Sequence, residues 1–324
     1  MWKWILATIA FFFIVIELVF FAPSSGDRET SLAMQQQHKE DHVDPVDHEQ
    51  VLSGGHLVES QGETKQWELE SEVARKKRGS EEWTLDKVKV KFFGENQVFY
   101  RAVGEKGFVT DNQKSLKIEG DVEIVSSNQY VINSEVIYYL TESRTIEGPK
   151  PVKMQGPPEA NGKGGPLFME AERFDADLST NVINLYDNVR GRKTMSDNRN
   201  MKIASHKAIF SGQSNYALFK EDVVIHVDSM TITGPRAKFI YKDGALYSLL
   251  INGGVKIKDI GKWGKAGEAE VFFQEDKYVF RDSPLVVQGE DELIGDEIIV
   301  YDGGERVQVV KAKAKYRANQ EESP

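Results

Sequence analysis

The chain contains no cysteine, which excludes disulfide bonds, thiolate metal sites and cysteine nucleophiles together. It also lacks the G-x-S-x-G, H-E-x-x-H and P-loop motifs, so no hydrolase, zinc-protease or nucleotide-binding signature is present. Its net charge of −10 argues against nucleic acid as the main partner, because binding to a phosphate backbone requires clustered Lys and Arg. These absences predict a protein that is not an enzyme and uses no cofactor.

Histidine is scarce as well, with six residues in the chain. His206 and His226 occupy polar positions of predicted strands, so we interpret them as surface residues rather than general bases. The other four, at positions 38, 42, 48 and 56, lie in or near a polar stretch without ordered spacing. A solvated linker explains them better than a metal site does, and we predict no metal.

Long hydrophobic runs are absent except at the N-terminus. Residues 4–22 are mostly apolar, and as a helix they would span about 29 Å, close to the hydrocarbon thickness of a bilayer. Lys3 precedes this run whereas Asp27 and Glu29 follow it, which predicts a cytoplasmic N-terminus and an exported remainder. We predict an uncleaved transmembrane anchor over residues 1–22. A cleaved signal peptide is the alternative, but Pro23 sits where cleavage would have to occur.

Polar sequence without periodicity follows the anchor and ends the chain. Residues 23–48 are rich in Gln, His and Asp, which predicts a flexible linker, and residues 318–324 are expected to form a disordered tail. Between these segments no stretch has the periodicity of an amphipathic helix. The exported part is therefore expected to be built from β-strands.

Alternation of apolar and polar residues dominates that exported part. In residues 220–243, Val223, Ile225 and Val227 mark every second position, and the pattern resumes from Met230 after a turn at Asp228-Ser229. Period-two spacing rich in Val, Ile, Thr and aromatic residues is typical of β-strands. The stretch therefore predicts two strands joined by a turn.

This two-strand unit recurs about every 33 residues. Its signature is a pair of residues such as Gly-Asp or Asp-Asn followed by an apolar residue, as in Gly120-Asp121-Val122 and Asp187-Asn188-Val189. A fixed period of this length signals stacked repeats in which neighbours share one apolar seam. We predict an all-β, elongated fold, with its best internal boundary in the glycine-rich stretch 161–166.

One residue in two should face the interior of such a sheet. The inward-facing, candidate lipid-binding residues are predicted to be Val122, Ile124, Val136, Tyr138, Phe174, Ile209, Val223, Ile225, Phe239, Phe272 and Ile298. If the interior closes tightly, these residues form a core. If it stays partly open, they line an apolar trough suited to acyl chains, with about 0.8 kcal/mol gained per buried CH₂. The pattern alone leaves both possibilities open.

Two basic clusters stand out against the acidic background. One is the run 75–78, and the other contains Arg190, Arg192, Lys193, Arg199 and Lys202. Solvated loops are one interpretation of both clusters. The alternative, which assigns the clusters a ligand, is contact with phosphates, either of bilayer headgroups or of a transported lipid.

The order of these features resembles a known family. Residues 67–85, Gly120-Asp121-Val122-Glu123-Ile124 and Pro151-Val152 resemble the periplasmic domain of the lipopolysaccharide transport protein LptC. Residues 233–241, TGPRAKFIY, are similar to the repeat of its relative LptA. The resemblance to this OstA-like group covers about residues 49–316. It implies an elongated open β-jellyroll built from two-strand repeats of about 33 residues.

The resemblance also implies a domain order and a role. Residues 49–157 would form an LptC-like jellyroll and residues 166–317 an LptA-like continuation, which is more than the single jellyroll usual for LptC. The protein would sit in the inner membrane with its C-terminal domain in the periplasm. It would receive lipopolysaccharide from the subunits of an inner-membrane ABC transporter. It would pass the lipid to the bridge protein LptA or an equivalent, by pairing of strand edges near residues 307–310.

Two other functions stay open at this point. A membrane-tethered structural or interaction scaffold would have the same strands, a closed core and no lipid cargo. An envelope hydrolase is a further possibility in principle, but no constellation of residues supports it.

Overall fold

The computed structural model describes residues 48–110, 115–159, 162, 164–212, 215–242 and 244–312. In these residues the chain forms one antiparallel sheet of 21 strands and one short 3₁₀ helix, η1 (Asp302–Gly304). Within the same ranges, no helix is long and apolar enough to cross a membrane. The predicted anchor, the predicted linker up to residue 47 and the predicted tail lie outside the described residues.

The strands follow one another along the chain with short connections. They are β1 (His48–Gln61), β2 (Thr64–Lys77), β3 (Glu82–Phe93), β4 (Phe99–Thr110), β5 (Ser115–Ser126), β6 (Val131–Leu140), β7 (Thr145–Gly148), β8 (Val152–Gln155), β9 (Phe168–Ala171), β10 (Arg173–Asp177), β11 (Val182–Thr194), β12 (Asn200–Ser211), β13 (Tyr216–Val227), β14 (Met230–Lys242), β15 (Ala245–Asp259), β16 (Lys262–Phe272), β17 (Lys277–Arg281), β18 (Leu285–Gln288), β19 (Asp291–Ile294), β20 (Glu297–Tyr301) and β21 (Arg306–Val310).

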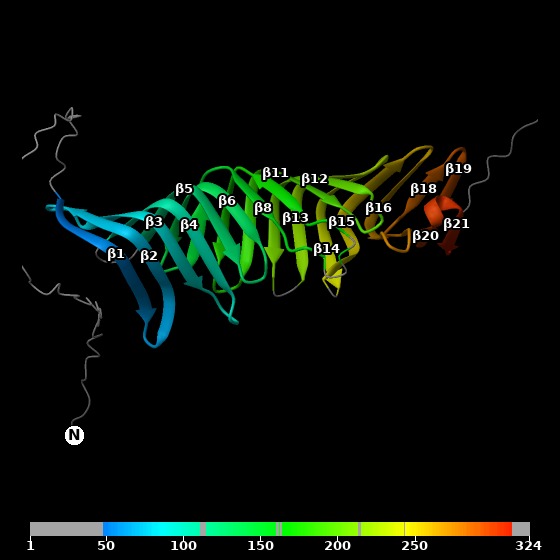
Figure 1. Cartoon of the computed structure of the whole chain (residues 1–324). Helices are drawn as coiled ribbons and strands as arrows, with labels where there is room; N and C mark the ends of the chain where they lie inside the picture. Colours follow the sequence, from blue (N-terminus) through cyan, green and yellow to red (C-terminus); the bar gives the residue numbers. More distant parts are fainter. Residues whose placement is uncertain are drawn as a thin grey trace, which may run out of the picture. The chain divides into compact units, whose positions relative to one another are not determined.

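Most strands pair with the strand that follows them, so the sheet is a long meander of hairpins (Figure 1). Where a long strand is broken in two, both pieces pair with the same neighbour: β7 and β8 both pair with β6, and β17 and β18 both pair with β16. The sheet continues without interruption past the glycine-rich stretch, because β8 pairs with β9 and β7 pairs with β10. The predicted all-β, antiparallel fold is confirmed, and it is consistent with a β-jellyroll.

A bend lies in the middle of most long strands. The register shifts there between neighbouring strands, as between Tyr186 and Val189 of β11. Asp187-Asn188, Glu221-Asp222 and Gly253-Gly254 each place two consecutive residues at positive φ, between 48° and 100°. Gly, Asn and Asp enter this left-handed region at the lowest cost. The recurring Gly/Asp/Asn signature therefore marks bends inside strands.

The bends fold the sheet over into two layers. Each long strand contributes one half to each layer, and each half pairs with halves of the same layer. Layer A contains β8, β9, β18, β19 and the segments 64–70, 88–93, 99–103, 122–126, 131–134, 189–194, 200–204, 223–227, 230–233, 255–259 and 262–266. Layer B contains β7, β10, β17, β20, β21 and the segments 73–77, 82–86, 106–110, 115–119, 136–140, 182–186, 207–211, 216–220, 236–242, 245–252 and 268–272. Buried side chains of both layers form one apolar cluster. We call the side opposite the bends, where the turns of the two layers approach each other, the mouth.

The bend at Glu221 gives a direct test of this backbone argument. Its φ is 65°, and the residue is exposed. We expect Glu221→Val to lower the free energy of unfolding by about 1–2 kcal/mol, because a β-branched residue is strained in the left-handed region. Glu221→Gly should be at least as stable as the parent, and urea unfolding would measure both. Equal stability of the two variants would contradict the proposed role of the bend.

Candidate lipid-binding interior

Most of the predicted inward-facing residues are buried between the two layers. Those that belong to the apolar interior, with at most 3% of their surface exposed, are Val122, Ile124, Phe174, Val223, Ile225, Phe239 and Ile298; Val136 is 7% exposed but lies outside that cluster. They belong to strands from β5 to β20, so the apolar interior runs through successive repeats. Contact of these side chains with a lipid stays a prediction.

Tyr138, Ile209 and Phe272 lie on the outer face instead, and the predicted orientation of these three is wrong. The inward positions of β12 are Met201 and Ile203 before the bend but Ala208 and Phe210 after it, which turns Ile209 outward. The same change of parity turns out Tyr138, which is 36% exposed, and Phe272. Period-two counting fails there because a bulge inserts unpaired residues and moves later side chains to the opposite face.

The interior contains aromatic residues that the sequence pattern did not single out. Two of them, Phe210 and Phe219, form a continuous edge-to-face row with the predicted residue Phe239, and the ring centroids are 5.9 Å and 5.3 Å apart. Tyr130, from a turn of layer A, meets Phe210 of layer B at 6.4 Å. A count restarted at each bend would have found Phe210. Pairs of this geometry add about 0.5–1.5 kcal/mol beyond the buried area. The row therefore stabilises layer B, and the contact of Tyr130 with Phe210 joins layer A to it.

Polar contacts bridge the mouth in the first half of the sheet. Arg144, from a turn of layer B, forms an ion pair with Glu95 of layer A at 2.7 Å and donates a hydrogen bond to the backbone oxygen of Phe93 at 2.9 Å. The side-chain amide of Asn181 donates to the backbone oxygen of Glu95 at 3.1 Å. These contacts hold the turn after β3 against the turns after β6 and β10.

A buried ion pair lies at the mouth in the middle of the sheet. Lys193 Nζ is 2.8 Å from Glu159 Oε1, and the two side chains are only 2% and 4% exposed. Lys193 also donates a hydrogen bond to the backbone oxygen of Gly165 at 2.6 Å. The pair thus ties β11 to both ends of the connection between β8 and β9. Sequence reasoning grouped Lys193 with a basic cluster that would be solvated or would contact phosphates, and its burial against Glu159 agrees with neither interpretation.

Arg199 and Lys262 bridge the mouth farther along the chain. Arg199 donates to the backbone oxygen of Phe273 at 3.1 Å, and Lys262 donates to that of Gly303. Asp197 holds Arg199 in place at 2.7 Å. Burial alone would raise the pKa of Asp197, but hydrogen bonds from the side chain and backbone of Arg199 outweigh it and lower the pKa. The pair therefore stays charged at neutral pH.

Beside these bridges the mouth opens into an apolar cavity of about 280 Å³. Its walls combine layer A residues Val227, Met230 and Ile257 with layer B residues such as Phe280. Tyr278 also lines it, and burial, together with nearby Asp276, raises the pKa of this phenol to about 12. The cavity offers apolar surface with a polar rim, and its tyrosine stays neutral. It suits part of an acyl chain.

Family comparison agrees with this architecture. Residues 7–195 match the model of the family described as lipopolysaccharide-assembly, LptC-related. The chain belongs to this family. Residues 202–306 match a second model, that of LptA and the N-terminal domain of LptD, described as a lipopolysaccharide transport protein. Members of these families are structural components of transport rather than enzymes, so this LptC-related chain is not an enzyme.

Comparisons with individual proteins show only distant similarity. One matching solved structure is LptH, the LptA-homologous periplasmic component of the lipopolysaccharide transport device from Pseudomonas aeruginosa. It shares 16% sequence identity, with a TM-score of 0.32, over 38% of this chain and 88% of LptH. No curated protein matches the chain.

The buried pair at the mouth predicts a large effect of a single substitution. Lys193→Met should lower the free energy of unfolding by about 3–5 kcal/mol, because it leaves the Glu159 carboxylate buried without a partner. Adding Glu159→Gln should restore much of this loss, since both charges are then gone. Chemical denaturation of the single and double variants would measure this.

The matched control is the exposed pair of Lys87 and Glu72, 2.9 Å apart with side chains 70% and 62% exposed. Lys87→Met should change the unfolding free energy by less than about 1 kcal/mol. Equal effects of Lys87→Met and Lys193→Met would mean that burial of the pair at the mouth does not matter.

Proposed function

We propose that this LptC-related protein is a membrane-anchored periplasmic carrier of lipopolysaccharide. The observation that carries the proposal is the continuous apolar interior between the two layers, with a cavity at its mouth. Acyl chains bind surfaces of this kind through the hydrophobic effect, at about 0.8 kcal/mol per buried CH₂. The interior serves as the path along which the chains move.

The interior is packed, so cargo must displace side chains or separate the layers. Covalent continuity at the bends holds one side of each repeat together. The described contacts between the layers at the mouth are side-chain packing, a few polar side-chain bridges and a backbone hydrogen bond from Glu95 to Leu178. Bound acyl chains replace the apolar contacts that the layers lose, so separation sacrifices mainly these bridges. The mouth is therefore the side on which the jellyroll opens.

The membrane anchor and the energy source complete the proposal. Residues 1–22 hold the protein in the inner membrane beside the ABC transporter that delivers lipopolysaccharide. Because the sequence contains no P-loop, the ATPase of the transporter supplies the energy. The periplasmic jellyroll then receives the lipid and moves it away from the membrane.

The two ends of the sheet supply docking edges. Among the described residues, β1 pairs only with β2 and β21 only with β20, so each has a free edge. An exposed edge is a template for a strand of another protein. We assign the β21 edge to the next periplasmic jellyroll, LptA or its equivalent.

A closed scaffold without cargo is the second candidate, and one observation favours it. Ile225, Leu249 and Val271 are all 0% exposed, as in an ordinary protein core. In that case the interior would serve stability alone, and the surface would carry the function.

Photocrosslinking in cells separates the two functions. A photoreactive residue at Phe210, Ile225 or Phe239 should give lipopolysaccharide adducts, because these positions line the interior. Ile209 is a matched control, since it is apolar and adjacent to Phe210 but faces outward. Gel mobility and immunodetection of the lipid would identify the adducts.

Folding must be verified for each photoreactive variant, for example by circular dichroism. Adducts at Ile209 as strong as those at Phe210 would show surface contact rather than an interior path. Absence of adducts at all three inner positions in folded protein would favour the closed scaffold.

Edge pairing can be tested at Val309. The backbone oxygen of Val310 accepts a hydrogen bond from Asp296, so in this antiparallel strand the N–H of Val309 points to the free edge. Val309→Pro should therefore weaken crosslinking to the partner jellyroll by about five-fold or more, because it removes one edge donor. Val309→Ala, which keeps the N–H, should retain it. Equal loss in both variants would indicate damaged packing of β21 rather than lost edge pairing.

A further inference from the structure

The outer face of layer A contains a hollow of about 550 Å³ that the transport path does not use. Four exposed cations line it: Lys153 of β8, Arg190 and Arg192 of β11, and Lys202 of β12. Its remaining lining includes Phe168, Ala204 and Val224. We call this feature the basic hollow. It combines an apolar floor with a positively charged rim.

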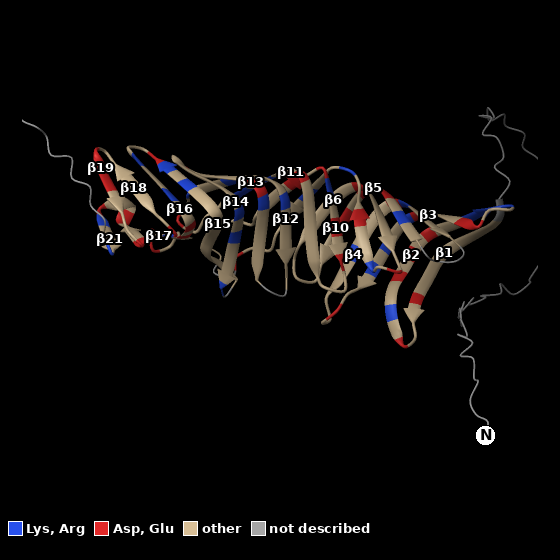
Figure 2. Cartoon of the chain, turned by 180° about the vertical axis from the view of Figure 1, so that it is seen from behind, with Lys and Arg blue, Asp and Glu red and all other residues tan. Residues whose placement is uncertain are grey.

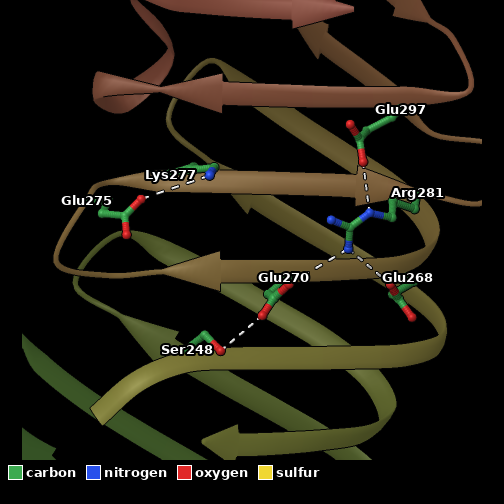
Figure 3. A network of polar contacts seen from close by, with 7 residues as sticks. All are labelled: Ser248, Glu268, Glu270, Glu275, Lys277, Arg281 and Glu297. Atoms are coloured by element: carbon green, nitrogen blue, oxygen red, sulfur yellow. Dashed lines mark hydrogen bonds and ion pairs between the residues drawn. The ribbon is translucent and has the colours of Figure 1, made fainter. Parts of the chain in front are cut away.

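Over the chain as a whole, residues of both charge signs are interspersed along the strands (Figure 2). Arg281 is the clearest case, with carboxylates of Glu297, Glu268 and Glu270 at 2.8, 3.3 and 3.7 Å (Figure 3). In the basic hollow, none of the four cations forms an ion pair with a described residue, although Glu170 also lines it. With four cations and one carboxylate in its lining, the basic hollow keeps an excess of positive charge within the described part of the chain.

Lys153 and Arg190 both lie directly opposite Glu170 in the register, whereas the other two cations are arranged unfavourably for folding. Arg192 lies directly opposite Lys202 in the register of β11 and β12. Like charges directly opposite each other destabilise a sheet. Arg192 is also held over the ring of Phe168, with its guanidinium carbon 4.7 Å from the ring centroid. A stacked guanidinium in a concave site is well suited to bind phosphate through two parallel hydrogen bonds.

The basic hollow and the mouth cavity lie back to back across the end of layer A. On β13, His226 lines the hollow and the next residue, Val227, lines the cavity. Arg199 lines the cavity, and Lys202 of the same β-hairpin lines the hollow. Three residues of extended chain span about 10 Å. An amphiphile with its acyl chains in the cavity therefore has its headgroup within reach of the hollow.

We propose that the basic hollow binds the phosphate groups of a phosphorylated glycolipid headgroup while the acyl chains of the same molecule occupy the mouth cavity. This inference rests on the proposed function and adds to it a second point of contact with the cargo. Layer A then separates the two chemical parts of the lipid, with the acyl chains inside and the charged headgroup outside.

The test is a binding cycle with the full chain in a neutral detergent at constant salt. The probes are lipid A and lipid A from which the phosphates have been removed. For the parent protein, dephosphorylation should weaken binding by about ten-fold or more, since it removes charge-assisted hydrogen bonds. The variant Arg190→Gln/Arg192→Gln/Lys202→Gln should bind lipid A at least about ten-fold more weakly than the parent does. It should bind lipid A and the dephosphorylated probe with equal affinity.

The control variant removes three cations from the outer face of layer B: Lys207→Gln/Lys220→Gln/Lys238→Gln. It should bind lipid A within about two-fold of the parent, as expected for surface charges remote from the ligand. Urea unfolding of both variants verifies that they are folded. An equal loss of affinity in the two triple variants would show that lipid A is attracted by surface charge in general and not by the basic hollow. That result would overturn the inference.

Other outcomes distinguish a failure of the proposed phosphate site from a failure of the proposed lipid-carrier function. If removal of the phosphates from lipid A weakens its binding to the Arg190→Gln/Arg192→Gln/Lys202→Gln variant as much as its binding to the parent, the phosphates bind elsewhere. Only the assignment of the basic hollow is then refuted. If inorganic phosphate displaces lipid A as effectively as lipid A itself, the hollow is a site for free phosphate. If the parent binds neither probe, the proposed function fails together with the inference.

Discussion

The left-handed residue pairs in the middle of the strands are the constraint on which this structure depends. Each pair bends its strand, and the aligned bends turn one antiparallel sheet into two layers. The fold-over creates the apolar interior, fixes which side chains face it and leaves a mouth on the opposite side. Asp, Asn and Gly recur at these positions because few other residues tolerate positive φ.

The interior is both a core and a candidate path for lipid. Side chains such as Phe219 and Phe239 are only 1% exposed and contact each other edge to face, as in the core of a globular protein. An acyl chain offers the same kind of apolar contact, so exchanging one for the other changes little in the hydrophobic free energy. The polar bridges between the layers at the mouth, which come from Arg144, Arg199 and Lys262, then set the cost of opening.

The sequence predicted the strand type, the repeat and most of the interior, because period-two alternation is a direct consequence of strand geometry. It failed at Tyr138, Ile209 and Phe272, since each follows a bend that changes the parity of the count. It also grouped Lys193 with Arg190 and Arg192, although β11 sends Lys193 inward and the two arginines outward. Contacts across the mouth join residues far apart in the chain, and no local pattern encodes them.

The most direct measurement of the central claim is lipid transfer by a protein whose mouth can be locked. A side chain added at Gly212 would place its Cβ 3.7 Å from Cγ of Asn128, across the mouth, so Asn128→Cys/Gly212→Cys should form a disulfide in a chain that has no other cysteine. We predict that the oxidised protein fails to accept or pass on lipopolysaccharide and that reduction restores transfer. Equal transfer by the oxidised and reduced forms would contradict the claim that the layers open at the mouth.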